Sequence, residues 1–147
     1  MLRHLTQTTK SIPVSTVERV WTLVDIKGKI LGRAATDIAN KLSGKNKVSY
    51  SHNTDVGDYV VVINASQVQV TGRKALSKVY TNYSGYPGGL KKEALGKAVD
   101  RVPEQVVRRA ISGMLPKNKL RDMRLARLHI YADDKHPYVA RLAKSKK

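Results

Sequence analysis

The chain has 147 residues, of which 28 are Lys or Arg and 11 are Asp or Glu, so its formal net charge is +17. This length fits one domain with a proper core and is short for two. Cys is absent, which excludes disulfides, and no apolar run approaches the roughly 20 residues of a membrane-spanning helix. A polyanion would relieve the cationic self-repulsion, so nucleic acid is the favoured partner. An anionic membrane is the alternative, but no long amphipathic helix with a basic face and aromatic anchors is present.

The segment 58–64 predicts a central strand. Five apolar or aromatic residues follow one another without alternation, as expected of a strand covered on both faces. Upstream, residues 21–25 predict a strand, and small apolar residues at helical spacing over 34–42 predict a helix that ends at Gly44. Strand, helix and strand in this order predict a parallel crossover. The small face, mostly Ala, should let the helix pack closely on the central strand.

Further elements follow with less regular patterns. Residues 68–70 alternate and predict a short edge strand. The Gly and Pro content of residues 80–89 predicts an irregular loop, and residues 90–102 keep a helical period. Pro103 predicts the start of a second helix, which Pro116 should end.

The ends of the chain are basic. Residues 117–127 predict a basic helix and residues 128–132 a last strand. Residues 138–147 predict a basic tail that is unstructured without a partner. Residues 1–16 predict a flexible basic arm, with a weak mitochondrial presequence as the alternative. The predicted organisation is therefore this arm, a single α/β domain over residues 17–137, and the tail.

Candidate catalytic residues do not combine into a site. The four His residues lack metal-ligand spacing, and no Cys is available to complete a metal site. Asp55 and Asp58 flank Gly57, where turn and capping roles are favoured over acid–base chemistry. Asp133 and Asp134 follow a strand, but a solvated turn explains them better. The sequence predicts neither a metal nor a cofactor, and nothing in it argues for an enzyme.

Four ordered motifs resemble one known family. They are residues 24–36 (VDIKGKILGRAAT), 55–65 with 70–74 (DVGDYVVVINA and VTGRK), 84–91 (SGYPGGLK) and 113–120 (GMLPKNKL). Together they are similar to bacterial-type large-subunit ribosomal protein thirteen, over about residues 21–137. The resemblance implies a three-layer α/β/α sandwich around a four-stranded, mostly parallel sheet. It also implies a non-enzymatic component of the large ribosomal subunit that binds ribosomal RNA and acts in subunit assembly.

Three positions depart from the family pattern. Tyr83 stands where the family commonly has His, and Asp133 stands where Gly is common. Arg121 and Asp122 replace a usual Gly-Arg pair, so the charge is kept while the backbone freedom of Gly is lost.

Basic loops and the basic helix are the predicted RNA-binding surface, with two tyrosines from the Gly-rich loop as stacking candidates. The alternative for the loop is that its tyrosines fold back onto the domain. The predicted RNA contacts are Lys45, Lys47, Arg73, Lys74, Lys78, Tyr83, Tyr86, Lys91, Lys92, Lys117, Lys119, Arg121, Arg124 and Arg127.

The predicted partners are large-subunit ribosomal RNA and neighbouring large-subunit proteins, with no membrane and no small-molecule substrate. The predicted location is the large ribosomal subunit in the bacterial cytoplasm, and an organellar ribosome is left open. Two other functions also stay open: a regulatory RNA-binding protein acting off the ribosome, and an RNA-processing enzyme.

Overall fold

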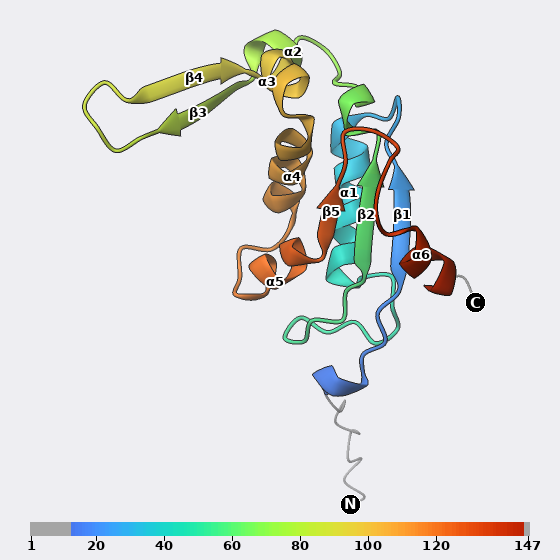
Figure 1. Ribbon diagram of the computed structural model, residues 1–147. Helices are drawn as coiled ribbons and strands as arrows, with labels where there is room; N and C mark the ends of the chain where they lie inside the picture. Colours follow the sequence, from blue (N-terminus) through green and yellow to red (C-terminus); the bar gives the residue numbers. More distant parts are fainter. Residues whose placement is uncertain (1–12, 146–147) are drawn as a thin grey trace, which may run out of the picture.

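A parallel sheet of three strands organises the computed structural model, which describes residues 13–145 (Figure 1). Strand β2 (Tyr59–Ile63) lies between β1 (Trp21–Asp25) and β5 (Leu128–Ile130), and both pairings are parallel. The residues Val60 to Val62 have no exposed surface. The prediction of a central strand buried on both faces is therefore confirmed.

One face of the sheet is covered by α1 (Leu31–Ser43) and α4 (Pro103–Met114). The buried face of α1 carries three alanines, whose small side chains let the helix approach β2 closely. Gly44 ends α1 in the left-handed conformation (φ 78°), and its N–H donates to the carbonyls of Asn40 and Lys41. Pro103 is the first residue of α4. The helix predicted over residues 34–42 and the helix predicted to begin at Pro103 are both confirmed.

Aromatic side chains cover the other face. Trp21 stacks on its register partner Tyr59 with ring centroids 4.4 Å apart, and on Tyr138 at 5.0 Å. Helix α6 (Val139–Ser145) follows Tyr138 directly in the chain and packs against β1. It lies in front of the sheet in Figure 1. The backbone N–H of Trp21 donates to Ser145 Oγ at 2.9 Å, and Leu142 is buried. The prediction of an unstructured tail is wrong over α6, because this helix packs against β1, buries Leu142 and places the Arg141 guanidinium 5.1 Å from the centre of the Trp21 ring.

The sheet differs from the one expected. In the described residues it has three strands rather than four, because residues 68–70 form only a single parallel bridge, from Gln69 to Ile30. The three-layer arrangement is not confirmed either. What holds is a mixed α/β domain with a parallel main sheet.

A hairpin replaces the predicted irregular loop and part of the predicted helix. Strand β3 (Val79–Tyr83) pairs antiparallel with β4 (Leu90–Ala94), and the two-stranded ribbon extends away from the domain (Figure 1). Only residues 84–89 are irregular, and helix α3 (Leu95–Arg101) begins five residues later than the helical period suggested. Residues 90–94 form a strand rather than the predicted helix because each residue of β4 has a cross-strand partner on β3.

Short elements complete the chain. They are η1 (Val14–Thr16), η2 (Ala65–Gln67), α2 (Lys74–Ser77) and α5 (Leu120–Ala126). The predicted flexible arm falls largely on residues 1–12, which lie outside the described residues. The division into arm, domain and tail stays a prediction.

Candidate nucleic-acid interface

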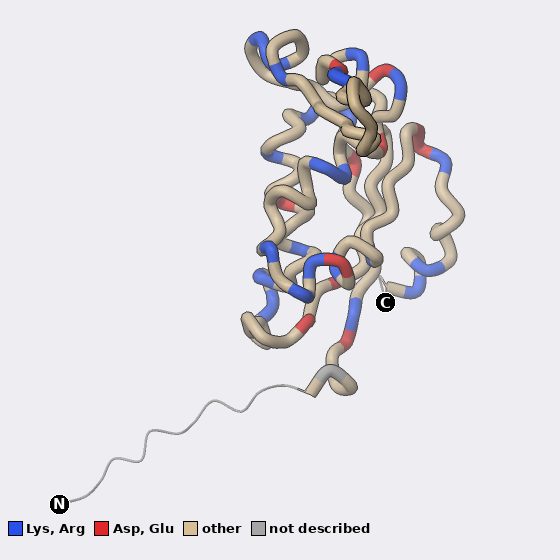
Figure 2. Tube along the Cα trace, turned by 90° about the vertical axis from the view of Figure 1, so that its left-hand side faces the viewer, with Lys and Arg blue, Asp and Glu red and all other residues tan. Residues whose placement is uncertain are grey.

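A cationic groove runs between α4 and α5. Its volume is about 440 Å³, and its lining includes four basic residues and no acidic one. Two of them, Lys117 and Arg121, were predicted RNA contacts. Figure 2, which views the molecule from this side, shows Lys and Arg positions recurring along the face. Such a lining suits a polyanion, because the positive potential of neighbouring cations adds up over a groove.

The other two cations of the groove, Arg108 and Arg109, were not among the predicted contacts. Their signal in the sequence was their position on α4, opposite the buried Val106 and Val107. Arg108 also has a structural role, because its Nη2 donates to the carbonyl of Leu128 at 3.1 Å and so ties α4 to β5. Arg109 is exposed, and its guanidinium lies 5.0 Å from the centre of the Tyr80 ring.

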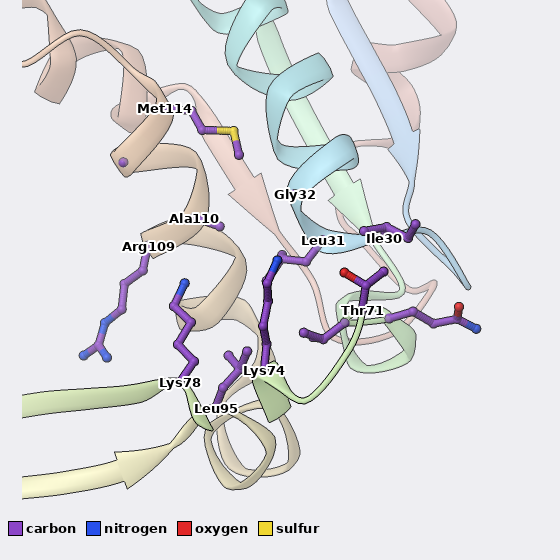
Figure 3. Close-up of a pocket in the computed structure, with 13 residues that line it drawn as sticks. Ile30, Leu31, Gly32, Thr71, Lys74, Lys78, Leu95, Arg109, Ala110 and Met114 are labelled. Carbon is purple, nitrogen blue, oxygen red and sulfur yellow. The ribbon is translucent and has the colours of Figure 1, made fainter. Parts of the chain in front are cut away.

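A second cavity opens between the N-terminal end of α1 and α4 (Figure 3). The predicted contacts Lys74 and Lys78 line it together with Arg109, over an apolar wall. The structure therefore brings these predicted cations together, although the sequence places them on different segments.

The hairpin carries four further predicted contacts. Tyr83 and Tyr86 are 61% and 75% exposed, while Lys91 and Lys92 are also exposed. Tyr83 and Tyr86 do not fold back onto the domain, so their rings are free to stack on a base. Tyr80 does fold back, and burial raises the pKa of its hydroxyl despite the opposing effect of Arg109.

Two predicted contacts lie inside the protein instead. Arg124 is 1% exposed and Arg127 is 7% exposed. Both face Asp55, which is itself buried: Arg127 Nη2 donates to Asp55 Oδ1 at 2.7 Å, and Arg124 Nε lies 3.6 Å from the same oxygen. Arg19 Nη2 lies 3.8 Å from Oδ2. The expectation that Arg124 and Arg127 contact RNA is therefore dropped, because their charges are engaged by a buried carboxylate.

The remaining four predicted contacts are dispersed. Lys45, Arg73 and Lys119 are exposed. Lys47 is half-buried, and its Nζ donates to Asp58 and to the carbonyl of Glu18. Its charge is thus partly compensated within the protein.

The described residues do not assemble a metal site: none of their His, Asp and Glu side chains gather in a group of three that could hold an ion. Within residues 13–145, no helix is both long and apolar enough to cross a membrane. Asp55 is paired with Arg124 and Arg127, and the His129 ring packs against the Tyr138 ring. Burial lowers the pKa of His129, and the nearby cations Arg108 and Arg141 lower it further.

These features define a small basic α/β protein. Its cationic side chains line an open groove between α4 and α5 and a cavity beside α1, and they are exposed on the protruding β3–β4 hairpin. Residues 19–137 match the model of the family described as ribosomal protein L13. The relatives, each called large ribosomal subunit protein uL13, are bacterial. The one from Geobacter sp. strain M21 is 49% identical over 129 residues, covering 88% of this chain and 91% of the relative. The relative from Geobacter sulfurreducens is 46% identical, covering 95% and 97%, and that from Acinetobacter baumannii 47%, covering 90% and 93%. The chain therefore belongs to the ribosomal protein L13 family.

Proposed function

We propose that the protein is built into the large ribosomal subunit, where it binds large-subunit ribosomal RNA through the α4–α5 groove and the hairpin. It is a structural ribosomal constituent and not an enzyme, as its family is. The observation that carries the proposed RNA-binding surface is the groove, which holds four cations and no acidic residue. The bacterial relatives support a place in the cytoplasmic ribosome, with ribosomal RNA and neighbouring large-subunit proteins as partners.

In this mechanism the domain is a rigid frame that holds cations at fixed spacing. Arginines of the groove make paired hydrogen bonds to phosphate oxygens, and lysines act as point charges. The grooves of A-form RNA offer side chains little sequence information, so preference comes from RNA shape and from unpaired bases stacked on the hairpin tyrosines. The proposed contacts are Lys45, Lys47, Arg73, Lys74, Lys78, Tyr83, Tyr86, Lys91, Lys92, Arg108, Arg109, Lys117, Lys119 and Arg121.

A salt titration of binding to large-subunit RNA fragments tests the groove. The double variant Lys117→Glu with Arg121→Glu should bind at least about tenfold more weakly, and its log–log salt slope should be shallower by about 1.4–1.8. The matched control is Lys135→Glu with Lys144→Glu, which makes the same change in net charge at exposed positions outside the groove. Equal losses in both variants would show that only net charge matters and would refute the groove as the binding surface.

Co-sedimentation decides between a ribosomal constituent and a regulatory RNA-binding protein. A stoichiometric constituent should stay with large subunits through high-salt washing. A protein that acts off the ribosome should wash away while still binding isolated RNA.

A further inference from the structure

The cavity beside α1 is built by three hydrogen bonds between separate segments. The Leu31 N–H donates to the Gln69 carbonyl, and the Gln69 N–H donates to the Lys29 carbonyl, both at 2.9 Å. The Leu95 N–H donates to the Lys78 carbonyl at 2.8 Å. These bonds hold residues 69–71 and the start of α3 against the helices. The result is a cavity of about 370 Å³ with defined walls.

The walls of this cavity are apolar and its charges are all positive. Leu31 and Leu95 are buried, so their side chains form a fixed surface. In Figure 3 the Lys74 side chain extends between α4 and α1 toward Leu31, the Lys78 side chain overlaps α4, and Met114 points from α4 toward α1. None of the lining residues is acidic, and none of the lining cations forms an ion pair within the described chain. The cavity thus suits an anion that carries an apolar part.

The α4–α5 groove and this cavity share part of their lining on α4, which favours RNA as the source of the anion. Arg109 and Gly113 line both, so a strand whose phosphates follow the groove reaches the cavity without leaving cationic surface. Gln69 and Thr71 also line the cavity, and their exposed side chains carry an amide and a hydroxyl, groups that can hydrogen-bond the edge of a base.

We propose that this cavity holds a single unpaired nucleotide of the bound RNA. Its base lies on the apolar wall of Leu31 and Met114, and its phosphate lies between Lys74 and Lys78. This inference rests on the proposed function, because the RNA strand is what delivers the nucleotide. It adds a built pocket to a surface that otherwise recognises phosphates and shape.

Filling the cavity is the sharpest perturbation. Gly32 lines it, has no positive φ, and a Cβ added there meets no atom within 4 Å. Gly32→Leu should therefore place a side chain in the cavity without strain in the fold. The matched control is Ala140→Leu, at an exposed position of α6 on the opposite face of the sheet. If Gly32→Leu does not fold, Lys74→Gln with Lys78→Gln tests the same pocket through its charges.

The first experiment titrates the full chain with 5′-AMP, adenosine or inorganic phosphate, followed by NMR of the backbone amides. We expect saturable shifts at Gly32, Thr71 and Leu95 with 5′-AMP, weaker binding of adenosine and of phosphate alone, and about tenfold weaker binding of 5′-AMP to Gly32→Leu. Unsaturable shifts spread over all cationic segments would overturn the pocket. So would equal binding to Gly32→Leu, or an acidic peptide that occupies the cavity where 5′-AMP does not.

The second experiment measures binding to large-subunit RNA fragments. Gly32→Leu should weaken binding about tenfold, while Ala140→Leu should bind as the wild type does. Unchanged RNA binding by Gly32→Leu would refute the RNA as the source of the nucleotide. If the wild type itself does not bind these fragments, the proposed function fails, and the 5′-AMP titration still decides separately whether the cavity takes a nucleotide.

Discussion

Replacing Asp55 by Asn is expected to destabilise the protein by about 3–5 kcal/mol, because it leaves two buried guanidinium groups without a counter-charge. Asp55 is 3% exposed, and it is the only carboxylate in an ion pair with Arg124 or Arg127 within residues 13–145. Asn keeps the size of the side chain and one acceptor oxygen. The variant therefore removes the charge while changing the packing little.

The expected loss is a large part of the total stability. Domains of this kind are stable by about 5–15 kcal/mol, so the variant should remain folded in buffer but unfold at much lower denaturant. With a slope of about 1–3 kcal/mol per molar urea, the midpoint should fall by about 2 M. Trp21, stacked in the aromatic layer, provides the fluorescence signal for this measurement.

Two further variants make the test specific. Asp122→Asn removes an equivalent charge from a side chain that is 87% exposed and should change stability by less than about 0.5 kcal/mol. Replacing the whole cluster, with Asp55→Leu, Arg124→Met and Arg127→Met together, should recover most of the stability, because no unpaired charge then stays buried. A loss below about 1 kcal/mol for Asp55→Asn would refute the idea that the arginines depend on this carboxylate.

Three other predictions concern the core and the sheet. Gly57→Ala should destabilise by about 1–3 kcal/mol or more, because its Cβ would lie 1.8 Å from the Leu42 carbonyl oxygen; Gly32→Ala, which meets nothing within 4 Å, should be neutral or stabilising in the same urea titration. Val107→Asp should abolish the folded circular dichroism spectrum, since the side chain is 1% exposed and the charge would have no partner there, and a folded variant would contradict this packing. Because the pKa of His129 is lowered on folding, the stability of the wild type should decrease as the pH falls below about 6.5 toward the folded pKa. His129→Gln should weaken this pH dependence. If the urea midpoint depends on pH identically in both proteins, His129 is not the group responsible.

The sequence predicted the elements whose signals are local. The unbroken apolar run of β2, the alanine face of α1 and the first-turn proline of α4 are each sufficient to define an element. The hairpin shows the limit of such signals. Residues 90–94 have a helical period, yet they form β4 because β3 supplies a register of partners that the period does not reveal.

The candidate site could be predicted only in part for the same reason. Exposed cations of the loops and the hairpin follow from composition, and most of them are on the surface as expected. The groove depends on the tertiary fold, which places α5 beside α4 and so brings Arg108 and Arg109 into one lining with Lys117 and Arg121. The sequence shows that these arginines are present, but it does not show that they line one groove with Lys117 and Arg121.

By itself, the sequence determined that this is a cationic α/β domain, and its motifs placed it in one family. Only the tertiary structure decided which cations remain available to a partner. Arg124 and Arg127 share a short basic segment with the exposed Lys117 and Lys119, but Asp55, which lies 72 positions before Arg127, draws both arginines into the interior. A charge becomes buried only where long-range packing brings it a counter-charge, and local periodicity contains no information about that partner.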